Sequence, residues 1–152
     1  MKILIAVDLS EATEKIVKAS QKIAQHFVSQ IWLIHVAQPK PELLTFDAGP
    51  KTERDFLAQR FRQEHSEIQT ISKRLRKTGI ETTALLVRGD VELGETTSDT
   101  IMREANKLQV DMIVVGSHGR GMMAQLFVGS VSQGVLSKAE CPVLIVPTSD
   151  TA

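Results

Sequence analysis

The chain has 152 residues, enough for one ordinary domain with a hydrophobic core that needs no disulfide or structural metal. Its hydrophobic content is 42%, its charged content is 24% and its formal net charge is zero, which argues against nucleic acid or an anionic membrane as the main partner. The single cysteine, Cys141, excludes an internal disulfide and is consistent with a reducing cytoplasm.

The apolar run at the start of the chain is shorter than the core of a signal peptide and shorter than a membrane span. The apolar run that begins at Ile3 ends before Asp8, which is too short for either. We interpret this run as a buried strand and expect a cytoplasmic protein that does not enter a membrane.

Hydrophobic periodicity predicts alternating strands and helices along the chain. The helix after the first strand has Ser10 as its expected N-cap, and its buried face is predicted to carry Ile16, Ala19, Ile23 and Phe27. Strands are expected at residues 3–7, 31–36, 81–88, 112–115 and 142–147, and helices at 11–27, 51–78, 98–108 and 129–139. For the third helix, Thr97 or Ser98 is the expected N-cap.

This alternation predicts a single α/β domain over residues 1–152, built as an open five-stranded parallel sheet with helices on both faces. The last strand lies between two prolines, which favours a place at the sheet edge. The long helix at 51–78 carries interspersed acids and bases on its polar side, so we interpret that side as a solvated face and not as a nucleic-acid surface.

A glycine-rich stretch follows the fourth strand directly, from Gly116 to a predicted helix start at Gly129. Glycines allow the backbone to approach an anion closely, and the free N–H groups of a helix N-terminus can bind it, so this layout is typical of a phosphate site. Ser130 and Ser132 add hydroxyls that can donate to phosphate oxygens. The alternative is a tight turn in which the glycines serve only backbone geometry. Neither the usual P-loop nor the Rossmann glycine motif fits.

Two other positions are predicted to share the edge of the sheet with this stretch. Asp8, Val36 and Gly116 lie at or just after the ends of three strands, and ligands of open parallel sheets bind outside the carboxyl ends of the strands. The sequence therefore predicts one crevice. Taken alone, Asp8 is equally well explained as a cap or turn residue.

The spacing Gly116-x2-Gly119-x9-Gly129-Ser130 resembles the ATP-binding signature of the universal stress protein family. Residues 5–8 and 33–36 resemble the first two strands of that family, and the similarity covers nearly the whole chain, including residues 141–143. The resemblance implies an adenine nucleotide alpha hydrolase-like, Rossmann-like fold. Two features depart from the family pattern: Leu9 stands where a small residue is common, and the loop at 89–98 is long and lacks the usual proline.

The resemblance implies that ATP, with Mg²⁺, is the cofactor. Asp8 would lie near the ribose, the phosphates or magnesium, and Val36 would hold adenine through its backbone. The residues implied to surround the ribose and phosphates are Gly116, His118, Gly119 and Arg120, and those implied to bind phosphates from the helix start are Gly129, Ser130, Val131 and Ser132. The family also implies a homodimer through the last strand, Val143–Val146.

No catalytic or metal-binding set can be assembled from the sequence. The histidines at 26, 35, 65 and 118 lack metal-ligand spacing, and His35 is expected to be a partly buried, satisfied side chain. We therefore expect a nucleotide-dependent stress-response switch with at most slow ATP hydrolysis, since neither a lysine clamp nor a catalytic base is evident. The alternative is a dimeric, stress-related interaction module that binds no nucleotide.

Overall fold

The strands form one parallel sheet in a computed structural model, which describes residues 1–37, 50–118 and 128–148. The order in the sheet is β3-β2-β1-β4-β5. The strands are β1 (Lys2–Ala6), β2 (Gln30–Ala37), β3 (Glu81–Arg88), β4 (Met112–Gly116) and β5 (Val143–Val146), and the helices are α1 (Thr13–Ala24), α2 (Pro50–Lys77), α3 (Thr97–Leu108) and α4 (Ser130–Lys138). This architecture confirms the predicted five-stranded parallel sheet, and β5 lies at an edge as expected.

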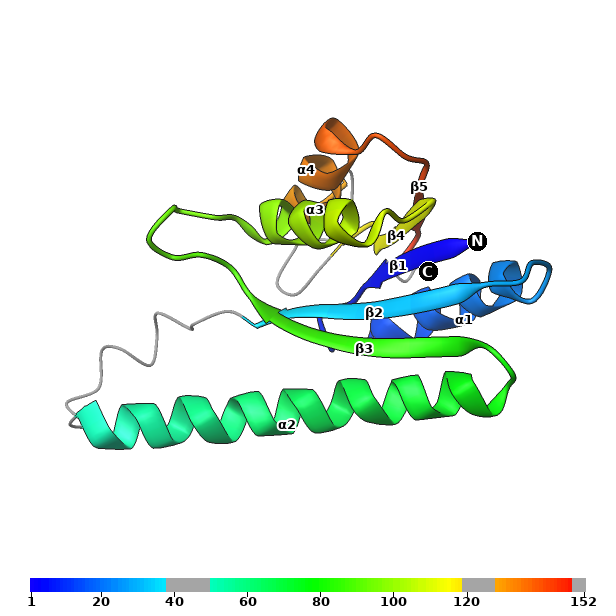
Figure 1. Cartoon of the computed structure of the whole chain (residues 1–152). Coiled ribbons are helices and arrows are strands. Elements are labelled where there is room, and N and C mark those ends of the chain that lie inside the picture. The colour runs from blue at the N-terminus through cyan, green and yellow to red at the C-terminus, as the bar shows by residue number, and fades with distance from the viewer. Residues whose placement is uncertain (38–49, 119–127, 149–152) are drawn as a thin grey trace.

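The helices cover both faces of the sheet, α1 and α2 on one side and α3 and α4 on the other (Figure 1). Strand order runs outward from β1 to β3 and then returns past β1 to β4 and β5. Because crossovers between parallel strands are right-handed, this reversal of direction sends the last two helices to the opposite face. The reversal lies between β1 and β4, which is where such sheets bind ligands.

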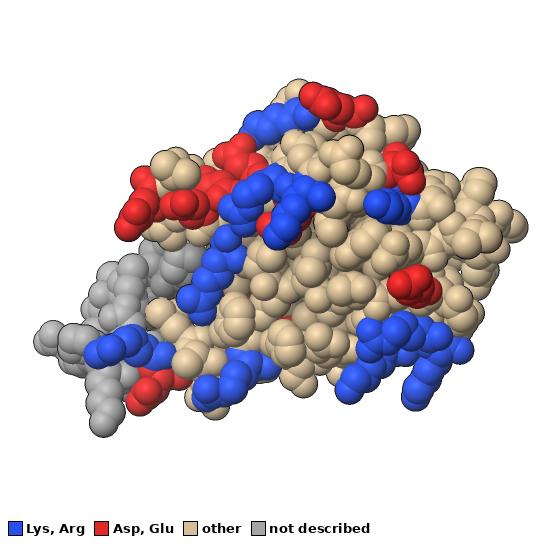
Figure 2. Space-filling view, viewed as in Figure 1, with Lys and Arg blue, Asp and Glu red and all other residues tan. Residues whose placement is uncertain are grey.

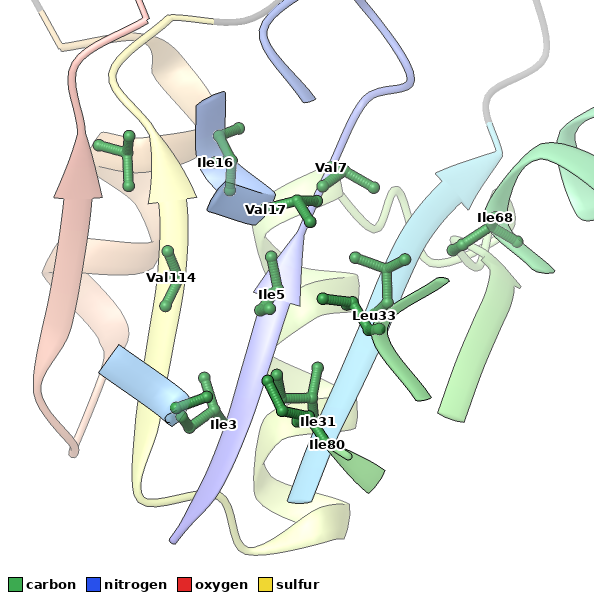
Figure 3. Close-up of a cluster of buried hydrophobic side chains, with 13 residues drawn as sticks. Ile3, Ile5, Val7, Ile16, Val17, Ile31, Leu33, Ile68, Ile80 and Val114 are labelled. Carbon is green, nitrogen blue, oxygen red and sulfur yellow. The ribbon is translucent and has the colours of Figure 1, made fainter. Parts of the chain in front are cut away.

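The core consists of two apolar layers, one on each side of the sheet. Figure 3 shows the layer under α1 and α2, where Ile3 and Ile5 of β1 lie beside Ile31 and Leu33 of β2, respectively. Ile16 and Val17 join this layer from α1. The second layer, on the α3 and α4 side, contains alternate residues of the same strands. Strands that are buried on both faces have near-continuous apolar sequences, which is why the strand positions could be predicted.

The first helix starts later than predicted. Helix α1 begins at Thr13 with Ala12 at the N-cap position, so the prediction of Ser10 as N-cap is wrong. The Ser10 N–H donates to Oδ1 of Asp8 at 3.0 Å, which places Ser10 in a turn instead. The helix also ends at Ala24, and Phe27, predicted to be buried, is 55% exposed.

The N-terminus of α3 likewise differs by one or two residues from the prediction of Thr97 or Ser98. Thr96 is the N-cap, and its side chain accepts from the Asp99 N–H while the Asp99 carboxylate accepts from the Thr96 N–H. This capping box satisfies two backbone donors at once, an advantage that neither neighbouring residue offers.

Helices α3 and α4 approach each other so closely that one position requires glycine. A Cβ built on Gly134 would lie 2.6 Å from the Cβ of Ser98, far inside van der Waals contact. The pairing of these two helices behind β4 and β5 therefore depends on the missing side chain. Across the described residues, no helix is long and apolar enough to cross a membrane.

Candidate functional site

The ends of β1, β2 and β4 lie at one edge of the sheet, as the sequence predicted. Ile5 of β1 is in register with Leu33 of β2 and Val114 of β4, so residues that follow these strands emerge side by side. The parallel pairing continues past β1, since the Val7 N–H donates to the Ile34 carbonyl at 2.9 Å. Asp8 is thus placed at this edge between the two flanking strands.

Asp8 begins a tight turn that leads into α1. Its Oδ1 accepts from the Ser10 N–H, and the Ser10 hydroxyl accepts from the Ala12 N–H at 3.3 Å. Between them Leu9 has a φ of +60°, a left-handed conformation that costs a non-glycine residue about 1–2 kcal/mol. Its half-buried side chain packs on the α1–α2 layer, and this packing offsets the strain. Leu9, which stands where the family commonly has a small residue, therefore strains the turn beside Asp8. It also fixes this turn to the core through its apolar side chain.

The start of α4 is tied to the end of β4 by two hydrogen bonds. The Gly129 N–H donates to the Ser117 carbonyl at 2.7 Å, and the buried hydroxyl of Ser132 donates to the Gly116 carbonyl. Each bond joins a residue at the beginning of the glycine-rich stretch to a residue at its end or in the helix that follows. The Ser132 hydroxyl, predicted as a phosphate donor, thus has a partner within the chain in this structure.

The helix start itself has no side-chain cap. Gly129 occupies the N-cap position without a side-chain hydrogen bond, and Ser130 is exposed at the first helical position. The N–H groups of the first helical turn, which belong to Ser130, Val131 and Ser132, have no acceptor within a helix. Together with the helix dipole they favour an anion at this end of α4.

A hydrogen-bonded cluster that the sequence analysis missed supports the residues after β4. Thr148, just beyond β5, accepts through Oγ1 from the His118 N–H at 3.1 Å and donates its own N–H to Oγ of Ser117 at 3.0 Å. Oγ of Ser117 also lies 3.0 Å from Nδ1 of His118. The only sequence signal for Thr148 was its position directly after the last predicted strand.

His118 also carries an unpaired atom. Its Nε2 is buried and finds no hydrogen-bond partner in the part of the chain that the structure describes. Buried polar atoms are seldom left without a partner, so this nitrogen is suited to a ligand group. Two further predicted residues, Gly119 and Arg120, lie outside the described residues.

Val36 and His35 occupy the end of β2 with different surroundings. The Val36 side chain is buried in the α3–α4 layer, so that only its backbone remains for ligand contact. His35 faces the other side, where its Nδ1 donates to the Val7 carbonyl at 2.9 Å and its Nε2 lies 3.3 Å from Oε2 of Glu64. His35 is buried and its Nδ1 has a partner, but its Nε2 forms no hydrogen bond within the described residues in spite of the nearby Glu64 carboxylate, so the prediction of a satisfied histidine is confirmed for one ring nitrogen only. No group of three or more potential metal ligands occurs within residues 1–37, 50–118 and 128–148.

Two titratable groups among the described residues, Asp99 and Cys141, have shifted pKa values. Hydrogen bonds from Lys138 and Thr96 hold the pKa of the Asp99 carboxyl well below its usual range. Burial raises the pKa of the Cys141 thiol, which packs at the border of the α3–α4 layer. A thiol with a raised pKa is a poor nucleophile at neutral pH, which favours a structural role.

Comparisons with known proteins find matches over nearly the full chain. The model of the universal stress protein family matches residues 1–147. A Thermus aquaticus relative, "Universal stress protein in QAH/OAS sulfhydrylase 3'region", is 30% identical over 145 residues that cover 95% of this chain and 96% of the relative.

Solved structures show the same fold. Protein MJ0577, from Methanocaldococcus jannaschii, has a TM-score of 0.80 at 25% identity, covering 99% of this chain and 97% of that one. The universal stress protein from Archaeoglobus fulgidus, solved in complex with dAMP, has a TM-score of 0.64 at 22% identity, covering 96% and 97%. The family model and the Thermus aquaticus relative both extend over almost the full length, and the chain therefore belongs to the universal stress protein family.

Proposed function

We propose that this universal stress protein binds ATP, with Mg²⁺, in the crevice between β1 and β4 and acts as a nucleotide-dependent switch in the stress response. The observation that carries the proposal is the uncapped N-terminus of α4. The N-cap residue, Gly129, has no side chain that could accept from the N–H groups of the first turn, and this turn lies across from the end of β4. An anion at this place would satisfy those groups and the helix dipole together.

Other features of the crevice support a nucleotide over a free anion. The buried Nε2 of His118 lacks a partner among the described residues, and Asp8 and the Val36 backbone lie at the neighbouring strand ends. Such an arrangement offers contacts for phosphates, ribose and base in one line along the sheet edge. The dAMP complex of the Archaeoglobus fulgidus relative is consistent with an adenine nucleotide as the ligand class.

We expect hydrolysis of bound ATP to be slow at most. The contacts we assign to the phosphates are backbone N–H groups, the exposed Ser130 hydroxyl and one histidine, which bind charge without activating a water molecule. Efficient phosphoryl transfer also needs a group that orients the nucleophile, and none of the proposed contacts has that role. The bound nucleotide therefore serves as a ligand that changes the protein, and its turnover is secondary.

We also infer a homodimer through β5. The sheet has two edge strands, and the free edge of β3 is obstructed at both ends. The Thr82 carbonyl accepts from Nη1 of Arg76 at 2.8 Å, and the Arg88 carbonyl accepts from Nη2 of Arg103 at 3.3 Å. Charged side chains that cover an edge prevent strand pairing, so β5, Val143–Val146, is the edge that favours a partner strand.

Equilibrium dialysis with ATP and Mg²⁺ tests the nucleotide proposal, with two variants at the exposed Ser130. Ser130→Glu places a negative charge at the helix start, which stabilises the helix but repels phosphate, so ATP affinity should fall at least tenfold while thermal stability is kept. Ser130→Gln is the neutral control of the same size. Wild-type protein without saturable binding, or equal affinity for the Glu and Gln variants, would rule out the proposed phosphate site.

One observation favours the alternative of an interaction module without nucleotide. The Gly129 N–H and the Ser132 hydroxyl both have partners within the chain, which gives these residues a structural purpose that needs no ligand. Mass spectrometry of small molecules released from freshly purified protein separates the two proposals. Recovered ATP or AMP excludes the alternative, whereas protein that is free of nucleotide and also fails the dialysis test supports it.

A further inference from the structure

A second pocket, of about 180 Å³, lies between α2 and the carboxyl ends of β2 and β3. Its apolar walls include Leu57 and Phe61 of α2 and Val91 of the loop after β3. An apolar cavity of about 150 Å³ accommodates benzene, so this pocket has room for one planar ring. Its lining includes none of the residues that we assign to the nucleotide crevice.

The pocket also carries three charged side chains, and two of them neutralise each other. Oε1 of Glu64 accepts from Nε of Arg60 at 3.1 Å, while Oε2 of Glu64 lies 3.3 Å from the buried His35 ring. The Glu64 side chain is only 14% exposed. The negative charge of Glu64 is therefore compensated on the α2 side of the pocket and does not repel an anion strongly.

The third charge, Arg88, is placed to receive an anion. Its guanidinium carbon lies over the Phe61 ring, 4.5 Å from the ring centroid, a cation–π contact that positions the charged group beside the apolar wall. A guanidinium carries five N–H donors in a planar fork that matches a carboxylate. Figure 2 shows Lys and Arg side chains along α2 and on the surface toward α3, with a group of Asp and Glu side chains beside the latter on the loop after β3.

From these contacts we propose that the pocket is a binding site for a small aromatic carboxylate. The ring occupies the apolar space beside Phe61 and Leu57, and the carboxylate pairs with the guanidinium of Arg88. Because Arg60 is paired with Glu64, the pocket offers one uncompensated cation beside an apolar surface, which favours a monoanion with a ring over a polyphosphate and over a neutral ring. The proposal does not depend on nucleotide binding in the crevice.

Titration with benzoate, followed by ¹H–¹⁵N NMR of the full chain, tests this site, with benzyl alcohol as the uncharged probe of similar shape. Benzoate should bind saturably in the low millimolar range, with the largest shifts at the amides of Phe61, Arg88 and Val91. Benzyl alcohol should bind about tenfold more weakly because it cannot form the charge-assisted hydrogen bonds.

Two arginine variants test whether benzoate binds through a specific contact with Arg88 or through the general positive charge of the surface. Arg88→Gln should weaken benzoate about tenfold and remove the preference over benzyl alcohol, whereas Arg62→Gln, on the exposed side of α2, should change neither. Three results would overturn the proposal: benzoate that does not saturate, equal losses in the two variants, or shifts centred on residues 129–132 with displacement by ATP.

Discussion

The buried hydroxyl of Ser132 joins the start of α4 to the end of β4, and its removal tests how the crevice is held together. Ser132 is 3% exposed, and its Oγ donates to the Gly116 carbonyl. A buried neutral hydrogen bond contributes about 0.5–1.5 kcal/mol, and an acceptor left without its donor costs about 1–3 kcal/mol. We therefore expect Ser132→Ala to lower the free energy of unfolding by about 1.5 kcal/mol.

Urea denaturation followed by circular dichroism measures this loss, which should appear as a lower midpoint with an unchanged m-value. For a chain of this size the same loss lowers Tm by about 3–6 °C. Ser130→Ala is the matched control, because Ser130 is exposed at the first helical position and its change should stay within about 0.5 kcal/mol. If both variants are equally stable, the Ser132 hydroxyl is not a structural link, and the reasoning from this contact fails.

Three further outcomes follow from other contacts. Gly134→Ala should destabilise the protein by about 2 kcal/mol in urea denaturation, although alanine favours helix, because the new methyl group overpacks against Ser98; a gain in stability would refute this. The depressed pKa of Asp99 means that its pairing with Lys138 stabilises the fold at neutral pH and that this contribution is lost as the pH falls below about 4. The stability difference between wild type and Lys138→Gln should therefore shrink in acid, and a constant difference would contradict the assignment. Cys141, whose pKa is raised, should react with iodoacetamide more slowly than free cysteine at pH 8; faster alkylation would show an activated thiol.

The architecture could be predicted because its signals are local. Strands covered on both faces, such as residues 31–36, are apolar without interruption, and helices with one buried face repeat their apolar residues at three and four positions. The parallel sheet then follows from connection rules, the edge position of β5 from its flanking prolines, and the gathering of Asp8, Val36 and Gly116 from the common edge at which parallel strands end.

Helix boundaries were less predictable, because neighbouring polar groups compete for the same backbone donors. Ser10 could equally have capped α1, but its hydroxyl accepts from the Ala12 N–H within the turn and the helix begins later. Thr96 prevails over Thr97 as N-cap because Asp99 completes the capping box from three residues away. Differences of this kind between alternative hydrogen bonds are small, so the sequence pattern alone does not rank them.

The sequence by itself determined the order of strands and helices and which strand ends share the edge where we propose the nucleotide crevice. Only the tertiary structure decided which residues near this edge already have partners: Ser132 bonds to Gly116 sixteen positions away, and Thr148 supports Ser117 across thirty-one. The same holds for Glu64 beside His35 and for Arg88 over Phe61. Such contacts join segments that approach each other only after the sheet has formed. They therefore cannot be predicted from hydrophobic periodicity or from the spacing of residues along the chain.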